Sequence, residues 1–328
     1  MSGNDDGQEP LKFKQLTYFL SLAEHGSISA AATALNMAQP SLSENIAKLE
    51  RQLEVQLAIR GTRGVQLTQA GTLLAERGKQ ILKSVDDLVD DLRHLGGEPR
   101  GPVSVGFPPS LSILLSVPLL ETIHTEHKGI RLHVAEAMSG DILEWLASER
   151  IDVGCVYEIN DSNLYIFEPL LTEELFLITA PDNWDDDFGP DGIAAKPIHA
   201  AQLQELPMVL TSQTHGARKI QERFARASGF SFNVVATIDS LPHIVEMVSR
   251  ASAYSILSHG AVIRQVADGS IGLVRIAEPS IRRTAYLVRK RSRPVSRASA
   301  IGHETIGTEI CEMVERHAIQ ASLPKDKP

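Results

Sequence analysis

The stretch from residue 26 to residue 50 limits the fold of this chain more than any other. Apolar residues recur in its first part at intervals of three and four, which predicts a helix with one apolar face: Ile28, Ala31, Ala32 and Leu35. A second helix is expected to begin near Pro40, because proline is favoured in a first helical turn. Its apolar face consists of Leu42, Ile46, Leu49 and Leu53. The pattern predicts a helix-turn-helix unit.

The other face of the second helix predicts a contact with DNA. Its side chains are polar and short enough to reach base edges or phosphates, while the bulky apolar residues turn inward. The residues expected to enter the major groove are Gln39, Pro40, Ser41, Ser43, Asn45 and Lys48. A glycine-containing, alternating stretch follows at residues 57–67 and predicts a hairpin wing. The residues expected to contact the DNA backbone are Ser27, Ser29, Arg60 and Arg63.

Residues 16–71 resemble the N-terminal winged helix-turn-helix of LysR-type transcriptional regulators. The resemblance rests on Gly26-Ser-Ile-Ser, Ala38-Gln-Pro-Ser-Leu-Ser, Leu49-Glu50 and Leu67-Thr-Gln-Ala-Gly71. Residues 57–65 are similar to the wing of the branch that contains the nitrogen-assimilation and cysteine-biosynthesis regulators. Many members have Phe where this chain has Ala58, so Ile59 is expected to pack the wing against the helices. Many also have a capping Ser where this chain has Ala38, which has no hydroxyl.

Length and charge support a multidomain regulator. The chain has 328 residues, more than one core usually holds, and 43% of them are hydrophobic. Its net charge of -9 argues against DNA binding by the chain as a whole. The expected DNA-binding domain, residues 11–70, nevertheless carries six Lys and Arg against four Glu. This small positive excess favours binding as a dimer. The acidic residues 1–10 are expected to be disordered.

Residues 68–95 predict a long linker helix that pairs two copies of the chain. Apolar residues recur every seven positions at Leu74, Ile81, Leu88 and Leu95, and the second seam position is filled by Val85 and Leu92. Gly78 interrupts this seam. The alternative is an amphipathic helix that lies on its own domain. The resemblance implies a homodimer or homotetramer, and two paired heads predict an imperfectly palindromic operator in double-stranded DNA.

Residues 96–102 are rich in glycine and proline and predict a hinge. Strand and helix patterns alternate after it, which is typical of an α/β domain. The resemblance implies that residues 103–320 form a two-lobed effector domain shaped like a periplasmic binding protein. Lobe 1 is expected at about 103–180 and 274–320, and lobe 2 at about 181–273, with crossings near Pro181 and Leu273. The predicted fold class is therefore multidomain, α and α/β.

A cleft between two such lobes predicts a site for a small molecule. Clefts of this kind lie at the carboxyl ends of strands, where helix N-termini attract anions. The candidate residues are Pro109, Ser110, Ser139, Gly140, Thr211, His215, Arg218 and Ser240. Their hydroxyls suit a small anion or a polar acid, and Arg218 is expected to pair with it. The alternative is that the three serines only cap helices. The basic stretch 282–293 is expected to be a solvated strand.

The sequence contains no motif of a phosphate-binding loop, a zinc-protease helix or a serine-hydrolase elbow. No enzyme activity, cofactor or metal site is predicted; His124 and His127 are interpreted as exposed or structural. Without a long apolar run or a secretion signal, a cytoplasmic protein with no membrane contact is expected. Cys155 and Cys311 are expected to be reduced and buried.

The sequence thus predicts a DNA-binding transcription regulator whose operator binding or activation is modulated by a small effector. Its expected partners are operator DNA, the effector and further copies of itself, with RNA polymerase as a candidate. One alternative is an effector-independent regulator whose second domain only mediates oligomerisation. A third reading is a solute-binding protein with an accessory head, against which the complete helix-turn-helix argues.

Overall fold

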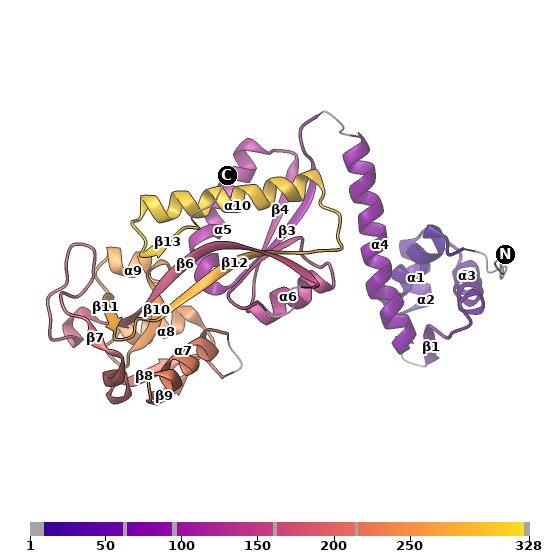
Figure 1. Cartoon of the computed structure of the whole chain (residues 1–328). Coiled ribbons are helices and arrows are strands. Elements are labelled where there is room, and N and C mark those ends of the chain that lie inside the picture. Colours follow the sequence, from indigo (N-terminus) through magenta and orange to yellow (C-terminus); the bar gives the residue numbers. More distant parts are fainter. Residues whose placement is uncertain (1–9, 62–63, 94–96, 160–162, 214–215, 325–328) are drawn as a thin grey trace, which may run out of the picture. The chain divides into compact units, whose positions relative to one another are not determined.

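A computed structural model describes residues 10–61, 64–93, 97–159, 163–213 and 216–324. The chain folds into two compact units, Met1–Arg93 and His94–Pro328. The helices and strands of both units are labelled in Figure 1. Four features of the sequence prediction lie outside the described residues: the disordered start up to residue 9, Arg63, Leu95 and His215.

The described part of the first unit consists of helices and one hairpin. In chain order these are α1 (Phe13–His25), α2 (Ile28–Ala34), α3 (Gln39–Gln52), β1 (Ala58–Gly61), β2 (Gly64–Leu67) and α4 (Gln69–Arg93). α1 ends at Gly26, whose φ of 63° is a left-handed conformation that favours glycine. Ser27 then caps α2, because its Oγ accepts a hydrogen bond from the backbone N–H of Ala30 at 3.1 Å.

The core of the first unit confirms the predicted helix-turn-helix. Phe19 and Leu22 of α1 are buried with Ala31 of α2 and with Leu42 and Leu49 of α3. The first turn of α3 contains proline, and Ala38 before it makes no side-chain cap, as its missing hydroxyl predicted. The small side chains of α2 allow the helices to pack closely around this core.

The wing is attached to the helices by hydrogen bonds between its backbone and the side chain of Glu50. The Glu50 carboxylate accepts from the backbone N–H groups of Leu57 and Ala58, at 2.8 and 3.1 Å. The expectation that Ile59 packs the wing was wrong, because Ile59 is 51% exposed and Ala58 is 8% exposed. Successive residues of a strand point to opposite faces, so the burial of Ala58 turns Ile59 outward.

Two glycines allow α4 to lie against the rest of the first unit. A Cβ at Gly71 would be 2.0 Å from the carbonyl oxygen of Leu57, and one at Gly78 would be 2.6 Å from Cδ1 of Leu16. Gly78 therefore interrupts the apolar repeat at the point where α1 packs on α4. Beyond this contact, Ile81 and Leu88 of the repeat are exposed.

The second unit has the alternating strands and helices of an α/β fold, as predicted. Its strands are β3 (Gly101–Phe107), β4 (Ile130–Glu136), β5 (Val153–Val156), β6 (Tyr165–Thr179), β7 (Ile198–His199), β8 (Pro207–Leu210), β9 (Asn233–Thr237), β10 (Ser255–Ser258), β11 (Gly272–Ala277), β12 (Arg282–Lys290) and β13 (Ala321–Ser322). Its α-helices are α5 (Pro109–Glu126), α6 (Ser139–Ala147), α7 (Gly216–Ala227), α8 (Leu241–Ser249), α9 (Ile263–Ala267) and α10 (Arg297–Arg316). Short 3₁₀ turns lie at Pro181–Asn183, Ala200–Glu205 and His259–Ala261.

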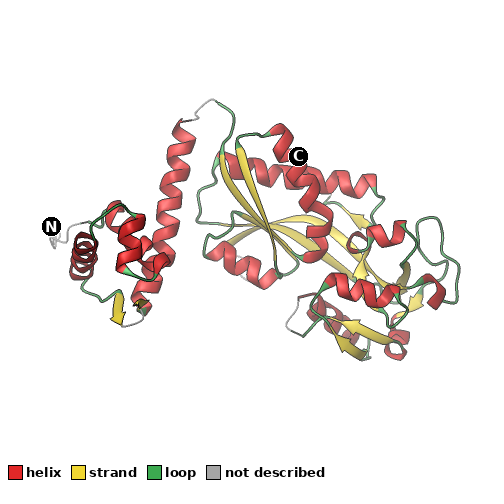
Figure 2. Cartoon of the chain, turned by 180° about the vertical axis from the view of Figure 1, so that it is seen from behind, coloured by secondary structure: helices red, strands yellow, loops and turns green. Residues whose placement is uncertain are grey.

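Two long strands connect the two lobes of this unit (Figures 1 and 2). The main sheet has the order β4-β3-β5-β12-β6-β11-β7, and β10 and β13 also pair with β6. Buried side chains change from the lobe 1 core to the lobe 2 core between Leu171 and Leu175 in β6. They change back between Ile281 and Ala285. These positions lie several residues from the expected crossings.

The first ten residues of the 15-residue strand β6 have a composition that disfavours a strand. They include Glu168, Pro169, Glu173 and Glu174, which interrupt the apolar pattern. Pairing with β12 supplies the backbone hydrogen bonds that hold residues 165–174 extended, from Tyr165 opposite Lys290 to Glu174 opposite Arg282. A tertiary contact therefore decides a structure that local composition disfavours.

We predict that Gly71→Ala destabilises the first unit by roughly 1–3 kcal/mol, because the added Cβ overlaps the Leu57 carbonyl oxygen and the backbone must shift. The measurement is urea unfolding of the full chain followed by circular dichroism. Gly140→Ala is the control: a Cβ there meets nothing within 4 Å, and alanine in a helix is favoured by up to about 1 kcal/mol. Equal midpoints for Gly71→Ala and the unchanged chain would contradict this packing of α4.

Candidate functional site

The exposed face of α3 carries the residues predicted to enter the major groove. Gln39, Pro40, Ser41 and Lys48 are exposed, and Ser43 and Asn45 are half-buried at the flanks of the helix. The Asn45 side chain donates from Nδ2 to the carbonyl oxygen of Ser41 at 2.9 Å, so it lies along the helix. Glu44, which the sequence prediction left out, is also exposed. The face is therefore polar and of mixed charge.

The residues predicted to contact the DNA backbone differ in what the structure describes. Ser29 is exposed, and Ser27 is half-buried with its hydroxyl engaged in the cap of α2. The backbone of Arg60 lies in β1, where it pairs with Val65 of β2. Arg63 lies outside the described residues. The wing hairpin is present as predicted, while the direction of its arginine side chains stays a prediction.

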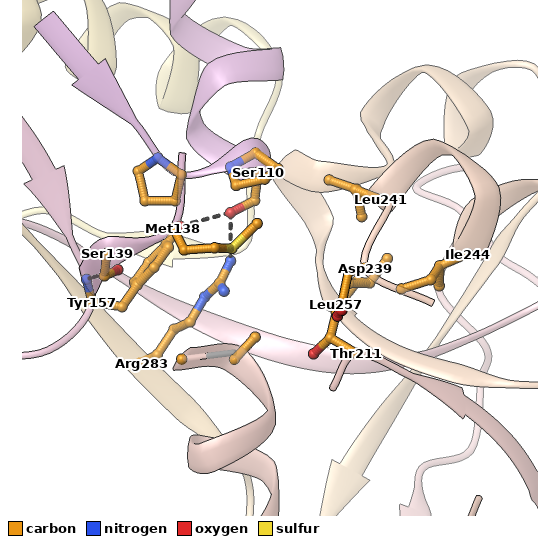
Figure 3. Close-up of a pocket in the computed structure, with 14 residues that line it drawn as sticks. Ser110, Met138, Ser139, Tyr157, Thr211, Asp239, Leu241, Ile244, Leu257 and Arg283 are labelled. Atoms are coloured by element: carbon orange, nitrogen blue, oxygen red, sulfur yellow. Dashed lines mark hydrogen bonds between the residues drawn. The ribbon is translucent and has the colours of Figure 1, made fainter. Parts of the chain in front are cut away.

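A cleft opens between the lobes of the second unit (Figure 3), with about 590 Å³ of space not filled by atoms, part of it open to solvent. Lobe 1 lines it with Pro108, Pro109, Ser110, Met138, Ser139 and Tyr157, and lobe 2 with Thr211, Gly216, Ala217, Asp239, Leu241, Ile244 and Leu257. Arg283 of β12 completes the wall. Four of the eight predicted ligand residues thus lie on one cavity: Pro109, Ser110, Ser139 and Thr211. Gly140, Arg218 and Ser240 do not line it.

Arg283 forms the polar centre of the cleft. Its guanidinium stacks 3.8 Å from the centre of the Tyr157 ring, and its Nε donates to the Glu173 carboxylate at 2.9 Å. Its Nη2 donates to the hydroxyl of Ser110 in lobe 1 at 3.0 Å and to that of Ser258 at 3.2 Å. Ser258 ends β10, so one guanidinium connects elements of both lobes. Figure 3 shows Arg283 pointing toward Ser110.

The expectation that the stretch 282–293 is solvated was wrong for Arg283, which is only 9% exposed. Burial disfavours the charged guanidinium, but the interactions with Glu173 and Tyr157 together outweigh it, and the pKa of Arg283 is raised. Burial also raises the pKa of the Tyr157 phenol, whose O–H donates to Glu173 at 2.9 Å. At neutral pH Arg283 is therefore charged and the Tyr157 hydroxyl is neutral.

The expectation that Arg218 is the cation facing a ligand was wrong. Its Nε donates to the Glu222 carboxylate at 2.8 Å, its Nη1 donates to the carbonyl oxygen of Thr211 at 3.4 Å, and its side chain is buried away from the cleft wall. Glu222 stands four residues later on the same helix, where an ion pair forms readily. This spacing is visible in the sequence and could have shown that Arg218 has an internal partner.

Thr211 directly follows strand β8, and its buried hydroxyl has no hydrogen-bond partner among the described residues. An unsatisfied buried hydroxyl is unfavourable. A hydroxyl of this kind on a cavity wall therefore suits a ligand that accepts a hydrogen bond from it. The alternative that the serines only cap helices finds no support. The N-cap residues of α5, α6 and α8 are Pro108, Met138 and Ser240, and none makes a side-chain cap bond.

Two further classes of site find no support within the described ranges. No group of three or more His, Cys, Asp or Glu side chains could hold a metal ion there. Nor does any described helix combine the length and the apolar character needed to cross a bilayer. Cys155 is buried in β5, and Cys311 is half-buried on α10, where both pack in the lobe 1 core.

Two family models match the chain. The model of the bacterial regulatory helix-turn-helix protein, lysR family, matches residues 13–72, and that of the LysR substrate binding domain matches residues 96–301. The nitrogen assimilation regulatory protein nac of Escherichia coli is 26% identical over 83% of this chain and 86% of its own length. The DNA-binding transcriptional dual regulator OxyR of Escherichia coli is 26% identical over 87% of this chain and 91% of its own.

Solved structures share the fold over nearly the whole chain. A full-length OxyR variant from Pseudomonas aeruginosa, with one cysteine replaced by aspartate, has a TM-score of 0.70 at 20% identity, covering 98% of this chain and all of the other. Full-length CbnR in complex with its target DNA has a TM-score of 0.63 at 20% identity, covering 94% of this chain and all of the other. Both likenesses confirm the predicted arrangement of a helix-turn-helix unit followed by a two-lobed α/β unit.

We predict that Glu173→Gln lowers the free energy of unfolding of the second unit by roughly 3–5 kcal/mol, because the buried Arg283 guanidinium would lose its carboxylate. Both tryptophans, Trp145 and Trp184, lie in this unit, so urea unfolding followed by tryptophan fluorescence reports on it alone. Glu246→Gln breaks the exposed pair with Arg250 and should cost no more than about 1 kcal/mol. Similar losses of unfolding free energy in both variants would show that the buried pair of Glu173 and Arg283 stabilises the unit no more than an exposed pair does.

Proposed function

Because the chain belongs to the LysR family of transcription regulators, we propose that it binds an imperfectly palindromic operator as a dimer or tetramer and responds to a small acid in the cleft of its second unit. It is a DNA-binding regulator and not an enzyme. The observation that carries the proposal is the pairing of an exposed polar helix on a helix-turn-helix core with a ligand-sized cleft whose wall holds an unsatisfied hydroxyl.

In this proposal α3 enters the major groove. The opposite face of the helix packs on the core of the first unit through buried Leu42, Ile46 and Leu49. Its polar face can therefore approach the bases without exposing the core. The groove contacts come from Gln39, Pro40, Ser41, Ser43, Asn45 and Lys48. Backbone contacts come from Ser27, Ser29, Arg60 and Arg63, which flank the helix in the chain. Phosphate contacts of this kind fix register, while the groove residues select sequence.

In this proposal α4 holds the helix-turn-helix units of two copies of the chain together. Ile81, Leu88 and Leu92 are exposed on this helix, whereas Leu74 packs against the core of the first unit. A row of exposed apolar side chains at seven-residue spacing is the pattern that pairs helices in a coiled coil. A dimer formed in this way places two recognition helices on two half-sites. The protein works in the cytoplasm, and RNA polymerase is a candidate further partner.

The effector is a small monocarboxylic acid with an apolar body. Arg283, Ser110 and Thr211 offer hydrogen-bond donors to a carboxylate, and the N-termini of α5 and α7 begin beside them. Leu241, Ile244 and Leu257 supply an apolar wall on lobe 2. Glu173 already balances the charge of Arg283, and Asp239 adds a negative charge to the wall. The one carboxylate of the ligand is therefore held by hydrogen bonds and helix N-termini, and a second carboxylate without such donors would be disfavoured.

Arg283 couples this ligand to the geometry of the lobes. Its Nη2 is shared between Ser110 of lobe 1 and Ser258 of lobe 2, so a carboxylate that competes for the guanidinium changes what holds the lobes together. A ligand shifts the conformation only if it prefers one lobe arrangement over the other. In the alternative function, the second unit only mediates oligomerisation and no acid binds. The unsatisfied Thr211 hydroxyl favours the effector-responsive form.

Peroxide sensing through a thiol is not part of the proposal, although relatives are named as hydrogen peroxide-inducible genes activators. Thiol sensors need an accessible cysteine of low pKa. The chain has two cysteines, Cys155 and Cys311. Cys155 is fully buried, and both pack in the lobe 1 core away from the cleft wall.

We predict that Lys48→Ala weakens operator binding about threefold and lowers the slope of log affinity against log salt by about 1, because one phosphate or base contact is lost. Genomic fragments selected with the purified chain supply the operator, and gel shifts at several salt concentrations give the slope. Lys128→Ala removes the same charge outside the first unit and should leave the slope unchanged. An unchanged slope for Lys48→Ala would place the recognition surface elsewhere.

We predict that Thr211→Val weakens binding of the activating acid about tenfold, because a hydrogen bond to a charged group is lost. The melting temperature of the full chain is measured with a panel of aliphatic and aromatic monocarboxylic acids. Without ligand, Thr211→Val should be at least as stable as the unchanged chain, because it removes an unsatisfied hydroxyl.

Ser228→Ala is the matched control, because it also removes a buried hydroxyl without a partner among the described residues, but outside the cleft. It should leave the effect of the acid intact. If no acid raises the melting temperature of the unchanged chain, the effector-independent alternative is favoured.

A further inference from the structure

Glu44 lies on the exposed face of α3 that is proposed to enter the major groove, but the proposed function assigns it no contact with DNA. It follows Pro40 by four residues and precedes Lys48 by four, so the three side chains share one face of the helix. All three are exposed, while Leu42 and Ile46 on either side of Glu44 are buried. Glu44 thus stands in the second turn of the helix, on the face turned away from the core.

Within the described part of the chain, no hydrogen bond or ion pair joins the carboxylate of Glu44 to another residue. Glu50, the other acidic residue of α3, is different. It is half-buried, and its carboxylate accepts two backbone N–H groups at the base of the wing. The fold therefore explains Glu50 and leaves Glu44 unexplained.

A carboxylate on a DNA-facing helix is repelled by the phosphates unless it meets a hydrogen-bond donor. An ionised carboxylate only accepts hydrogen bonds. In the major groove guanine presents two acceptors, and thymine presents an acceptor and a methyl group. Donors are the amino groups of cytosine and adenine, but adenine also presents N7, an acceptor that would face the second carboxylate oxygen. Cytosine is the base whose groove edge suits a glutamate.

We propose that Glu44 selects a cytosine in each half-site of the operator by accepting a hydrogen bond from its N4 amino group. This inference rests on the proposed entry of α3 into the major groove. The selection works largely by exclusion, because any other base leaves a desolvated carboxylate facing an acceptor or a methyl group. For the same reason Glu44 weakens binding to non-specific DNA and widens the gap between operator and competing sites.

Substitutions at this position separate base reading from a structural role. Glu44→Gln keeps the size of the side chain but adds an amide donor, and such a side chain pairs with N6 and N7 of adenine. It should change the selected base from cytosine to adenine. Glu44→Ala should leave no preference at that position. Glu54→Gln is the matched control: Glu54 is also exposed and loses the same charge, but it follows the end of α3.

The experiment is selection from a DNA library randomised over both half-sites, with the full-length chain and the three variants, followed by competition gel shifts. The unchanged chain and Glu54→Gln should prefer cytosine about tenfold or more at one dyad-related pair of positions. Glu44→Ala should equalise the four bases there, keep the other preferences and bind random DNA more tightly. Glu44→Gln should select adenine.

Three results would overturn the inference, and they are distinguishable from one another. If Glu44→Ala selects the same bases as the unchanged chain at every position, Glu44 reads no base. If Glu44→Ala loses binding to all DNA, its role is structural, because loss of a negative charge should strengthen non-specific binding. If the unchanged chain itself selects no dyad sequence, the proposed operator recognition fails and the role of Glu44 fails with it.

Discussion

The antiparallel pairing of β6 with β12 is the interaction on which the second unit depends. Both strands pass from one lobe to the other, and Glu173 and Arg283 stand opposite each other in this ladder. A buried ion pair is tolerated only where the remaining donors and acceptors are also bonded. Tyr157, Ser110 and Ser258 supply such partners. Any movement of one lobe against the other must therefore keep this guanidinium bonded.

The same constraint gives the cleft its chemistry. Lobe 1 and β12 provide most of the hydroxyls and the guanidinium, whereas lobe 2 provides most of the apolar wall, with Thr211 as a polar exception. In the proposed mode of binding, a ligand with one charged and one apolar end would be oriented across the two lobes. Its polar end would meet the group that connects the lobes, so recognition of the ligand and control of lobe geometry would use the same side chain.

Patterns within one element predicted the fold well. The errors had two sources, a contact between distant elements and local patterns that the sequence prediction did not use. The helix-turn-helix followed from apolar spacing and Pro40, and Ser110 and Thr211 were found because they stand where strands end or helices begin. Arg283 was missed because it lies among other basic residues, and its carboxylate partner is 110 positions away in the chain. Arg218 was chosen wrongly despite a partner four residues later. The prediction that Ile59 packs the wing was wrong because alternation along the strand turns its side chain outward.

The contact at Gly78 fixes how α4 is rotated about its own axis relative to α1. One side of the helix is held against α1 at Gly78, and the exposed residues of the seven-residue repeat, which we propose pair with a second copy, begin at Ile81, three residues later. Each residue of a helix turns it by about 100° and advances it by about 1.5 Å. In the proposed dimer, the angle between a recognition helix and the α4 face that pairs with the second copy is thus set by the number of residues between these two contacts. Inserting one residue between these two contacts would turn each head about the pair axis and move its recognition helix off the face of the duplex that it reads.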